Sequence, residues 1–270
     1  KFSEFGNNIS PLNEVERFKI FSSLLEQLPY NSSLRPFGNS DTYLFEIPGI
    51  ISGYKRDNIS IETIAEEIKI NNEFFKKSLP LFLELHKIHY TKLNETVFTQ
   101  FVNNLQNLGF SDFAFVNYII QLRQDYTEEK FTKLRNQIFN EFNTGFSVEI
   151  TKKQLELVEL FKKYQMTLKE IGKYDYDDMV ISVVNKFKTD KELLAIFQEK
   201  YQYILVDEYQ DTNNSQNEVL ASLGSFWINP NIFVVGDDDQ SIFRFQGASI
   251  ENMIFFYNNY CFIDILNNLI

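Results

Sequence analysis

Carboxylates follow two short apolar segments in the last quarter of the sequence. The first segment, YILV (203–206), is followed at once by Asp207 and Glu208. The second, IFVVG (232–236), is followed by three consecutive Asp residues and then Gln240. Carboxylate oxygens can hold Mg²⁺, and a neighbouring Glu can orient or deprotonate a water that attacks a phosphate. These residue types predict phosphate chemistry, although acids in such places also cap helices or lie in solvated turns.

The elements that must position these acids form a strand–helix–strand unit. Residues 203–206 and 232–236 lack the alternation of half-exposed strands, which is typical of strands buried on both faces of a sheet. A helical segment at about 214–224 separates them, and the whole has the length of a parallel βαβ unit. Ligands of open parallel sheets bind at the carboxyl ends of the strands, so the acids, including Asp211, are expected at a ligand-binding edge.

The rest of the chain is predicted to be mostly helical. Residues 29–58 contain several Pro and Gly and are predicted to be irregular. Thr189 and Glu192 have capping-box spacing, which predicts the start of another helix. Apolar periodicity and capping signals predict helices at 12–28, 60–70, 71–89, 94–107, 111–127, 128–142, 151–172 and 178–188. We therefore predict a helix-dominated α/β protein, with an all-helical accessory module at 1–150 and a partial parallel-sheet domain at 151–270.

Composition limits the classes of function. The net charge of −11 disfavours coating of nucleic acid by bulk attraction, but it leaves room for a local basic track. The single Cys, Cys261, argues against a disulfide framework and favours a reducing compartment. No apolar run reaches the roughly 18 residues that span a membrane, and no signal peptide is recognisable. We expect a cytoplasmic protein.

Three motifs resemble those of superfamily 1 DNA helicases of the UvrD/Rep/PcrA type. VDEYQDTN (206–213) resembles motif II, the Walker B box, and VVGDDDQSIFRFQGAS (234–249) resembles motif III. YDYDDM (174–179) resembles the segment that precedes motif II, and the three occur in the family's order. The resemblance implies that 151–270 holds the later half of motor domain 1A, with a RecA-like sheet of the P-loop NTPase type. It also implies that 1–150 corresponds to accessory domain 1B.

The resemblance assigns a nucleotide site to these motifs, with ATP and Mg²⁺ as cofactors. Asp207 would bind the Mg²⁺ of MgATP, and Glu208 would be the catalytic base that positions the attacking water. Gln240 would contact the γ-phosphate and report its loss to the DNA groove. Gln210, Asp211 and Thr212 would complete the polar network between the nucleotide site and the DNA site.

The resemblance also implies a site for single-stranded DNA. Phe243 and Phe245 take the places of aromatic residues that stack on bases, a contact worth roughly 1–3 kcal/mol per base for any sequence. Arg244, between them, is assigned to the same contact. Lys55 and Arg56 are predicted to contact phosphates at junctions of single-stranded and duplex DNA, with a purely solvated pair as the alternative.

A phosphate-binding loop of the form G-x-x-x-x-G-K-[ST] is absent from the sequence, in which the only Gly-Lys pair, Gly172-Lys173, is followed by Tyr174. We therefore expect an internal piece of a longer 3′-to-5′ helicase or translocase, inactive alone. The Walker A region and second motor domain would lie elsewhere in the polypeptide. Two alternatives are a non-catalytic DNA-binding or interaction module derived from a helicase, and a two-metal nuclease.

Overall fold

Helices dominate the computed structural model, which describes residues 9–124 and 130–236. Its contacts divide the chain into two compact units. Unit 1 consists of Lys1–Ile61 and Leu160–Ile270, and unit 2 consists of Glu62–Glu159. Unit 1 is therefore assembled from two separate stretches of sequence, whereas unit 2 is one continuous stretch.

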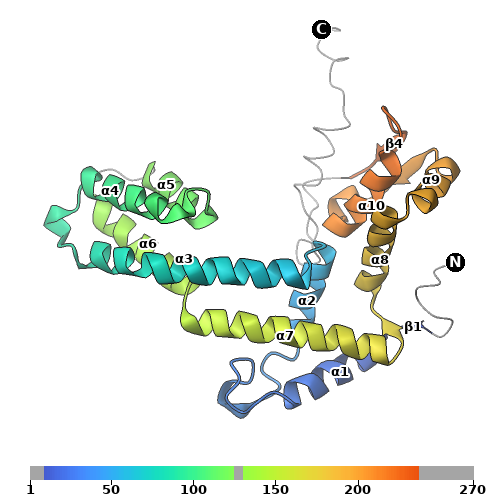
Figure 1. Cartoon of the computed structure of the whole chain (residues 1–270), viewed down its shortest axis with the longest axis horizontal. Coiled ribbons are helices and arrows are strands. Elements are labelled where there is room, and N and C mark those ends of the chain that lie inside the picture. The colour runs from blue at the N-terminus through green and yellow to red at the C-terminus, as the bar shows by residue number, and fades with distance from the viewer. Residues whose placement is uncertain (1–8, 125–129, 237–270) are drawn as a thin grey trace, which may run out of the picture. The chain divides into compact units, whose positions relative to one another are not determined.

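Unit 1 combines several helices with two small parallel sheets. Its helices are α1 (Glu14–Glu26), α2 (Glu46–Arg56), α8 (Tyr176–Thr189), α9 (Lys191–Lys200), α10 (Asn214–Gly224) and the C-terminal part of α7 (Val148–Glu170). Figure 1 shows α8, α9 and α10 lying next to one another beside strand β4.

The predicted βαβ unit is confirmed. Strand β3 (Ile204–Val206) pairs in parallel with β4 (Ile232–Val234), and α10 forms the crossover between them. A second parallel pair, β1 (Ser10–Pro11) with β2 (Lys173–Tyr174), joins the two stretches of sequence that make up unit 1. The second pair was not predicted, because two-residue strands leave no pattern in a sequence.

Burial of β3 and β4 on both faces was a wrong prediction. Leu205 and Phe233 face each other in the register and are 77% and 62% exposed, respectively. On the other face Ile232 is half-buried and packs against the end of α10, where a Cβ on Gly224 would lie 3.0 Å from Ile232 Cδ1. Within the described residues the sheet has only two strands, with α10 against one face.

Helix α2 lies in the segment that was predicted to be irregular. Pro48 suggested a break, but it stands in the first turn of α2, where a missing N–H costs no helical hydrogen bond. Ile47, Ile51 and Lys55 are spaced four residues apart and are all buried, so they form the inner stripe of the helix. The inclusion of a lysine in this stripe hid the pattern.

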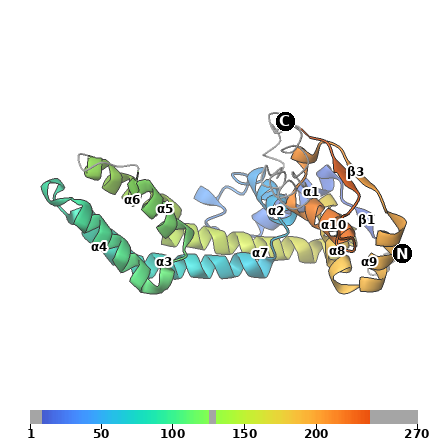
Figure 2. The same ribbon diagram turned by 90° about the horizontal axis from the view of Figure 1, so that it is seen from above.

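Unit 2 is helical throughout its described residues. Its helices are α3 (Ile61–Lys87, from its second residue), α4 (Glu95–Leu105), α5 (Ala114–Gln124), α6 (Phe131–Gly145) and the N-terminal part of α7, with a π-helical turn at Gln106–Phe110. Helix α3 is continuous across the predicted pair 60–70 and 71–89 and contains Pro80. Figures 1 and 2 show α4, α5 and α6 grouped near the C-terminal end of α3.

Aromatic rings form the centre of unit 2. Phe82 and Phe142 stack with ring centroids 3.8 Å apart and planes inclined by 10°. Phe74 makes edge or tilted contacts with several further rings, including Phe113 at 4.3 Å. These side chains are contributed by α3, α6 and the segment before α5, so stacking and burial hold the helices together.

A membrane-spanning helix is not found among the described residues, because no helix there combines sufficient length with sufficient hydropathy.

Candidate functional site

The acids after β3 begin a tight turn, residues 207–212, which we call the acid loop. Asp207 and Glu208 are both exposed at the carboxyl end of the strand. Glu208 has φ 49° and ψ 46°, the left-handed conformation, which costs about 1–2 kcal/mol for a residue with a Cβ. The chain then enters a short 3₁₀ helix, Tyr209–Asp211. Backbone strain of this kind gathers at functional sites, because surrounding structure must hold it in place.

Hydrogen bonds fix the two carboxylates at the start of the acid loop. Asp207 Oδ1 accepts a hydrogen bond from the Glu208 backbone N–H at 3.0 Å. Gln210 is only 2% exposed, and its Nε2 donates to Glu208 Oε2 at 2.6 Å. A buried amide thus orients the Glu208 side chain, as a group that positions a water requires.

The acid loop is attached to the segment that follows β4. The Val235 N–H donates to Val206 O at 2.8 Å, and the Tyr209 N–H donates to Val235 O at 2.9 Å. Gly236 comes next and packs against Gln210, where an added Cβ would lie 2.6 Å from Gln210 Oε1. The acid loop and residues 235–236, which follow β4, are therefore connected through backbone hydrogen bonds and the packing of Gln210.

The other end of the acid loop runs directly into α10. Thr212 Oγ1 donates to Tyr209 O at 2.7 Å and accepts from Asn217 Nδ2 at 3.3 Å. Asn213 caps α10 and forms a reciprocal capping box with Gln216. These bonds make the loop and the first turn of α10 one hydrogen-bonded structure.

Asp211 carries a buried acceptor in this structure. Its Oδ1 has no hydrogen-bond partner among the residues that the structure describes. A buried carboxylate oxygen without a donor is costly, and such atoms call for an explanation in a ligand, a water or another part of the chain. Its assignment to the nucleotide network stays a prediction.

Lys55 was predicted to contact DNA, but its side chain is buried. The side chain is 2% exposed, and Nζ lies 2.5 Å from Asp175 Oδ2 and 2.7 Å from Asp178 Oδ1. Its charge is therefore already neutralised inside unit 1. We do not propose a contact between Lys55 and DNA phosphates. Arg56 is partly exposed, although its Nε lies 3.3 Å from Asp177 Oδ1, and its role at DNA stays a prediction.

The pairing of Lys55 with Asp175 and Asp178 was not predicted from the sequence. Asp175 caps α8 in a capping box with Asp178, and the Tyr164 hydroxyl donates to Asp175 Oδ2 at 3.1 Å. Burial acts to raise the pKa of Asp175, but the charge and hydrogen bond of Lys55 and the Asp178 backbone together hold it below its ordinary value. Burial raises the pKa of Asp178, which Lys55 offsets only in part, and burial keeps Tyr164 neutral by raising its pKa.

The remaining predicted site residues, Gln240, Phe243, Arg244 and Phe245, lie outside the described residues. Of the residues predicted to bind the nucleotide, the structure brings Asp207, Glu208 and Asp211 together in one turn.

The exposed carboxylate of Asp207 is a candidate metal ligand. No group of three or more His, Cys, Asp or Glu side chains that could hold a metal occurs in the described parts of the chain. Mg²⁺ is usually held by one or two carboxylates, with water and phosphate oxygens completing its shell. The exposed Asp207 carboxylate at the strand end fits that mode.

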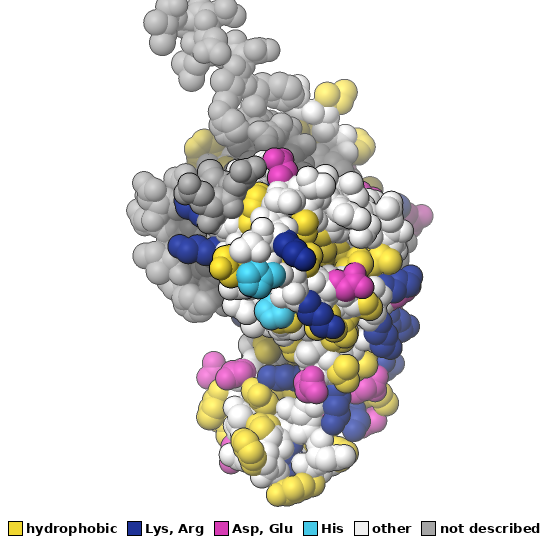
Figure 3. Space-filling view, turned by 90° about the vertical axis from the view of Figure 1, so that its left-hand side faces the viewer, with side chains coloured by type: hydrophobic (Ala, Val, Ile, Leu, Met, Phe, Trp, Pro, Cys, Tyr) yellow, Lys and Arg dark blue, Asp and Glu magenta, His cyan; other side chains and the backbone are white. Residues whose placement is uncertain are grey.

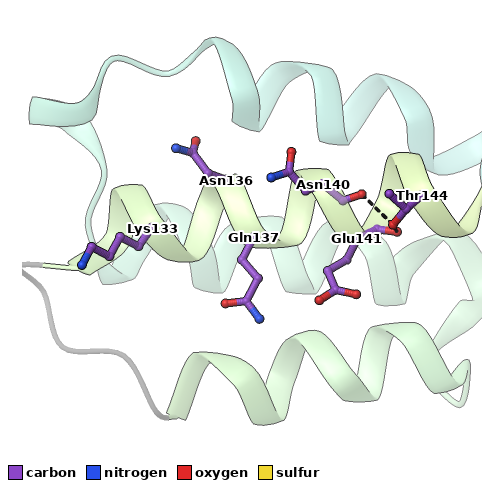
Figure 4. A pocket seen from close by; sticks show the side chains of 6 residues that line it. All are labelled: Lys133, Asn136, Gln137, Asn140, Glu141 and Thr144. Carbon is purple, nitrogen blue, oxygen red and sulfur yellow. Dashed lines mark hydrogen bonds between the residues drawn. The ribbon is translucent and has the colours of Figure 1, made fainter.

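Unit 2 has an open hollow of about 560 Å³ along α6. Figure 4 shows the side chains that line the hollow, all of which project from α6: Lys133, Asn136, Gln137, Asn140, Glu141 and Thr144. Gln137 and Glu141 meet at the Tyr118 hydroxyl, which accepts from the first and donates to the second. In Figure 3, Lys and Arg side chains are interspersed with Asp and Glu on the face shown. We assign no chemistry to this hollow.

Comparison with known proteins gives the class of the chain. Residues 8–261 match the UvrD/REP helicase N-terminal domain, and the chain belongs to this family. The resemblance drawn from the motifs is therefore confirmed.

The relatives with curated names include ATP-dependent DNA helicase PcrA of Staphylococcus epidermidis strain RP62A and of Staphylococcus aureus strain NCTC 8325. Each is 41% identical to this chain over 101 residues. The match covers 37% of this chain and 14% of each relative, so it spans only a small part of their length.

Proposed function

We propose that this chain is part of the motor of an ATP-dependent DNA helicase or translocase, which couples MgATP hydrolysis to 3′-to-5′ movement along single-stranded DNA. The observation that carries the proposal is the acid loop. It combines an exposed Asp207 at the end of a parallel strand with a Glu208 that is held in a left-handed conformation and oriented by Gln210. Membership of the UvrD/REP helicase family supports it.

In this proposal the acid loop acts on the γ-phosphate side of bound ATP. Asp207 would hold the Mg²⁺ that accompanies the nucleotide, which would neutralise phosphate charge when bound. Glu208 would orient a water for attack and accept its proton, with one carboxylate oxygen fixed by the Gln210 amide. Gln240 and Asp211 would complete the contact between nucleotide and loop.

The DNA side of the proposal rests on sequence. Phe243, Arg244 and Phe245 would bind single-stranded DNA, and Arg56 would contact phosphates near a junction with duplex DNA. The sequence-based division, with residues 1–150 as accessory domain 1B and 151–270 as part of motor domain 1A, stays a prediction, whereas the contacts group Lys1–Ile61 with Leu160–Ile270. The proposal includes a cytoplasmic location, because a single Cys is typical of proteins in a reducing compartment.

The proposal includes a negative expectation for the 270 residues alone. They contain no G-x-x-x-x-G-K-[ST] segment, so the backbone cradle that such a loop gives to phosphates would come from elsewhere in a longer polypeptide. Steady-state ATPase assays with Mg²⁺, with and without single-stranded DNA, should detect no turnover by this chain. DNA-stimulated turnover would overturn the expectation and reveal an unrecognised phosphate site within these residues.

The decisive variant is Glu208→Gln in the longer polypeptide that carries this chain. We expect ATPase turnover to fall at least about 100-fold, the usual contribution of a positioned general base, while ATP binding is retained. Glu199→Gln, an exposed glutamate on α9, is the matched control and should leave turnover unchanged. Normal turnover by Glu208→Gln would overturn the role of Glu208.

Two other outcomes would replace the proposal with the alternatives. DNA binding without any ATPase activity in the longer polypeptide would indicate a non-catalytic binding module derived from a helicase. Cleavage of DNA that requires Mg²⁺ but no ATP would indicate a nuclease.

A further inference from the structure

The last two residues of α2 and the two residues after it, 55–58, are bonded to α10. Ser215 lies in the first turn of α10 and is buried, and its Oγ is 2.8 Å from Lys55 O and 2.9 Å from Arg56 O. A single hydroxyl is therefore directed at the last two carbonyls of α2. Carbonyls at a helix C-terminus have no partner within the helix, so they are natural acceptors for it.

Two further bonds between side chains surround the Ser215 contact. Asn214 Nδ2 donates to Asp57 Oδ1 at 3.0 Å, and Asn58 Nδ2 donates to Glu218 Oε2 at 2.6 Å. Asn58 itself has φ 52°, a left-handed conformation that Asn tolerates better than most residues. Lys188 of α8 also donates to Glu218, at 3.0 Å. The bonds place α10 in one register along the end of α2.

The end of α2 is in turn fixed to α8 by the buried charge of Lys55. Its ammonium group pairs with both Asp175 and Asp178. The ring of Tyr164 lies 5.1 Å from Nζ, close enough for a cation–π contact. Moving this end of α2 would leave the buried Asp175 and the partly buried Asp178 without their counter-charge, which is strongly unfavourable. The end of α2 is therefore a rigid support.

The supported turn of α10 is continuous with the acid loop. Asn213 caps the helix, and Thr212 is bonded both to Asn217 within α10 and to Tyr209 within the loop. A displacement of the first turn of α10 is thus transmitted to the loop that begins with Asp207 and Glu208. The strained backbone at Glu208 requires such external support.

We propose that Lys55 and Ser215 are positioning residues for the acid loop: α8 holds Lys55, the end of α2 holds Ser215, and Ser215 fixes the turn from which the loop emerges. The assignment to catalysis rests on the function proposed above, whereas the assignment to loop position does not. In this proposal Lys55 supports the acid loop and does not contact DNA.

The first test measures loop position without any ligand. In metal-free and nucleotide-free protein, amide hydrogen exchange of residues 207–217 should be about tenfold faster in Ser215→Ala than in wild type, the effect of losing about one hydrogen bond. The variant should fold, because Lys55 O still accepts from the Asn58 N–H at 3.0 Å. Ser222→Ala, on the same helix, is the matched control and should exchange like wild type.

A second variant keeps the test decisive if Ser215→Ala fails to fold. Asn214→Ala removes only the exposed bond to Asp57, and we expect two- to threefold faster exchange over 207–217, a smaller effect because exposed bonds contribute less. Exchange equal to wild type in every folded variant of the two would overturn the proposal.

The catalytic consequence is tested in the longer polypeptide. Ser215→Ala should raise the Mg²⁺ concentration for half-maximal ATPase activity about tenfold, the same loss of one hydrogen bond felt at the acid loop. A mere loss of folded protein would leave that concentration unchanged. If Glu208→Gln abolishes turnover but Ser215→Ala leaves the Mg²⁺ requirement unchanged, the positioning role in catalysis is overturned and the proposed function stands. If Glu208→Gln has no effect, the proposed function fails, and the exchange data alone decide the positioning of the loop.

Discussion

Gly236 lies so close to Gln210 that a Cβ at position 236 would be 2.6 Å from Gln210 Oε1 and 3.2 Å from its backbone nitrogen. The same Gln210 side chain donates to Glu208 Oε2. The segment that leaves β4 therefore helps to hold the amide that orients the proposed catalytic carboxylate, so the two strand ends are mechanically coupled through one glutamine.

Gly236→Ala should uncouple them. The new methyl group forces Gln210 to shift, and overpacking of this kind costs typically about 1–3 kcal/mol of unfolding free energy. Chemical denaturation of the chain measures that cost, and ATPase assays of the longer polypeptide proposed above should show a parallel loss of turnover. Gly49→Ala in α2 is the control, because nothing lies within 4 Å of its added Cβ. A Gly236→Ala protein as stable as wild type would contradict the close packing described.

Lys55→Met should be among the most destabilising single changes in unit 1. It leaves the buried Asp175 and the partly buried Asp178 without their counter-charge, and breaking a buried ion pair in this way costs about 3–5 kcal/mol. Arg56→Met is the matched control. Its pair with Asp177 is partly exposed and should contribute about 0–1 kcal/mol. Urea denaturation compares the two, and equal losses would argue against a buried charge at Lys55.

Asp175→Asn should change how stability depends on pH. The folded-state pKa of Asp175 is lowered, so its charge contributes stability above its ordinary value of 3.8, and this contribution is lost as pH falls toward the folded value. The difference in unfolding free energy between wild type and Asp175→Asn should therefore be constant near neutral pH and shrink below about pH 4.

Asn is the suitable replacement for that experiment because it can still cap α8. Asp178 is present in both proteins, but the charge of Asp175 is one cause of its raised pKa, so its contribution differs between the two curves. Denaturation at a series of pH values gives the difference. A difference that grows on acidification would mean that the pKa of Asp175 is raised instead.

Phe142→Ala should remove about 3–5 kcal/mol from the stability of unit 2. Its ring is fully buried and stacks on Phe82, so truncation leaves a cavity in the aromatic core. The only Trp, Trp227, belongs to unit 1, so far-UV circular dichroism is the suitable probe. Tyr90→Ala, at an exposed ring of unit 2, should change stability by less than about 0.5 kcal/mol.

The parts of the fold with local signals could be predicted from the sequence. Helix α10 (Asn214–Gly224) has the predicted bounds, and β3 and β4 lie within the two predicted apolar segments. Short-range periodicity and the length of the crossover are enough to define such a unit. The placement of Asp207 and Glu208 at the end of a parallel strand followed from the same signals.

The rest depends on contacts between distant residues. Lys55 and Asp175 are 120 positions apart, and nothing near Lys55 in the sequence indicates that its charge is buried. Gln210 was assigned to no carboxylate, because its bond to Glu208 depends on a backbone conformation that a Glu seldom adopts. One capping prediction was also displaced: Asp190 caps α9, whereas the Thr189 hydroxyl bonds back to Asn185 in α8.

The split sequence of unit 1 has a consequence for the protein during its synthesis. Unit 2 is continuous, so its aromatic core can close as soon as Glu159 has left the ribosome. Helix α2 must wait for Asp175, which is 120 residues later than Lys55. At about 5–20 residues per second this delay is roughly 6–24 s. During that interval Lys55 lacks both carboxylates that neutralise its charge, so the end of α2 cannot take up its buried position until the start of α8 has been made.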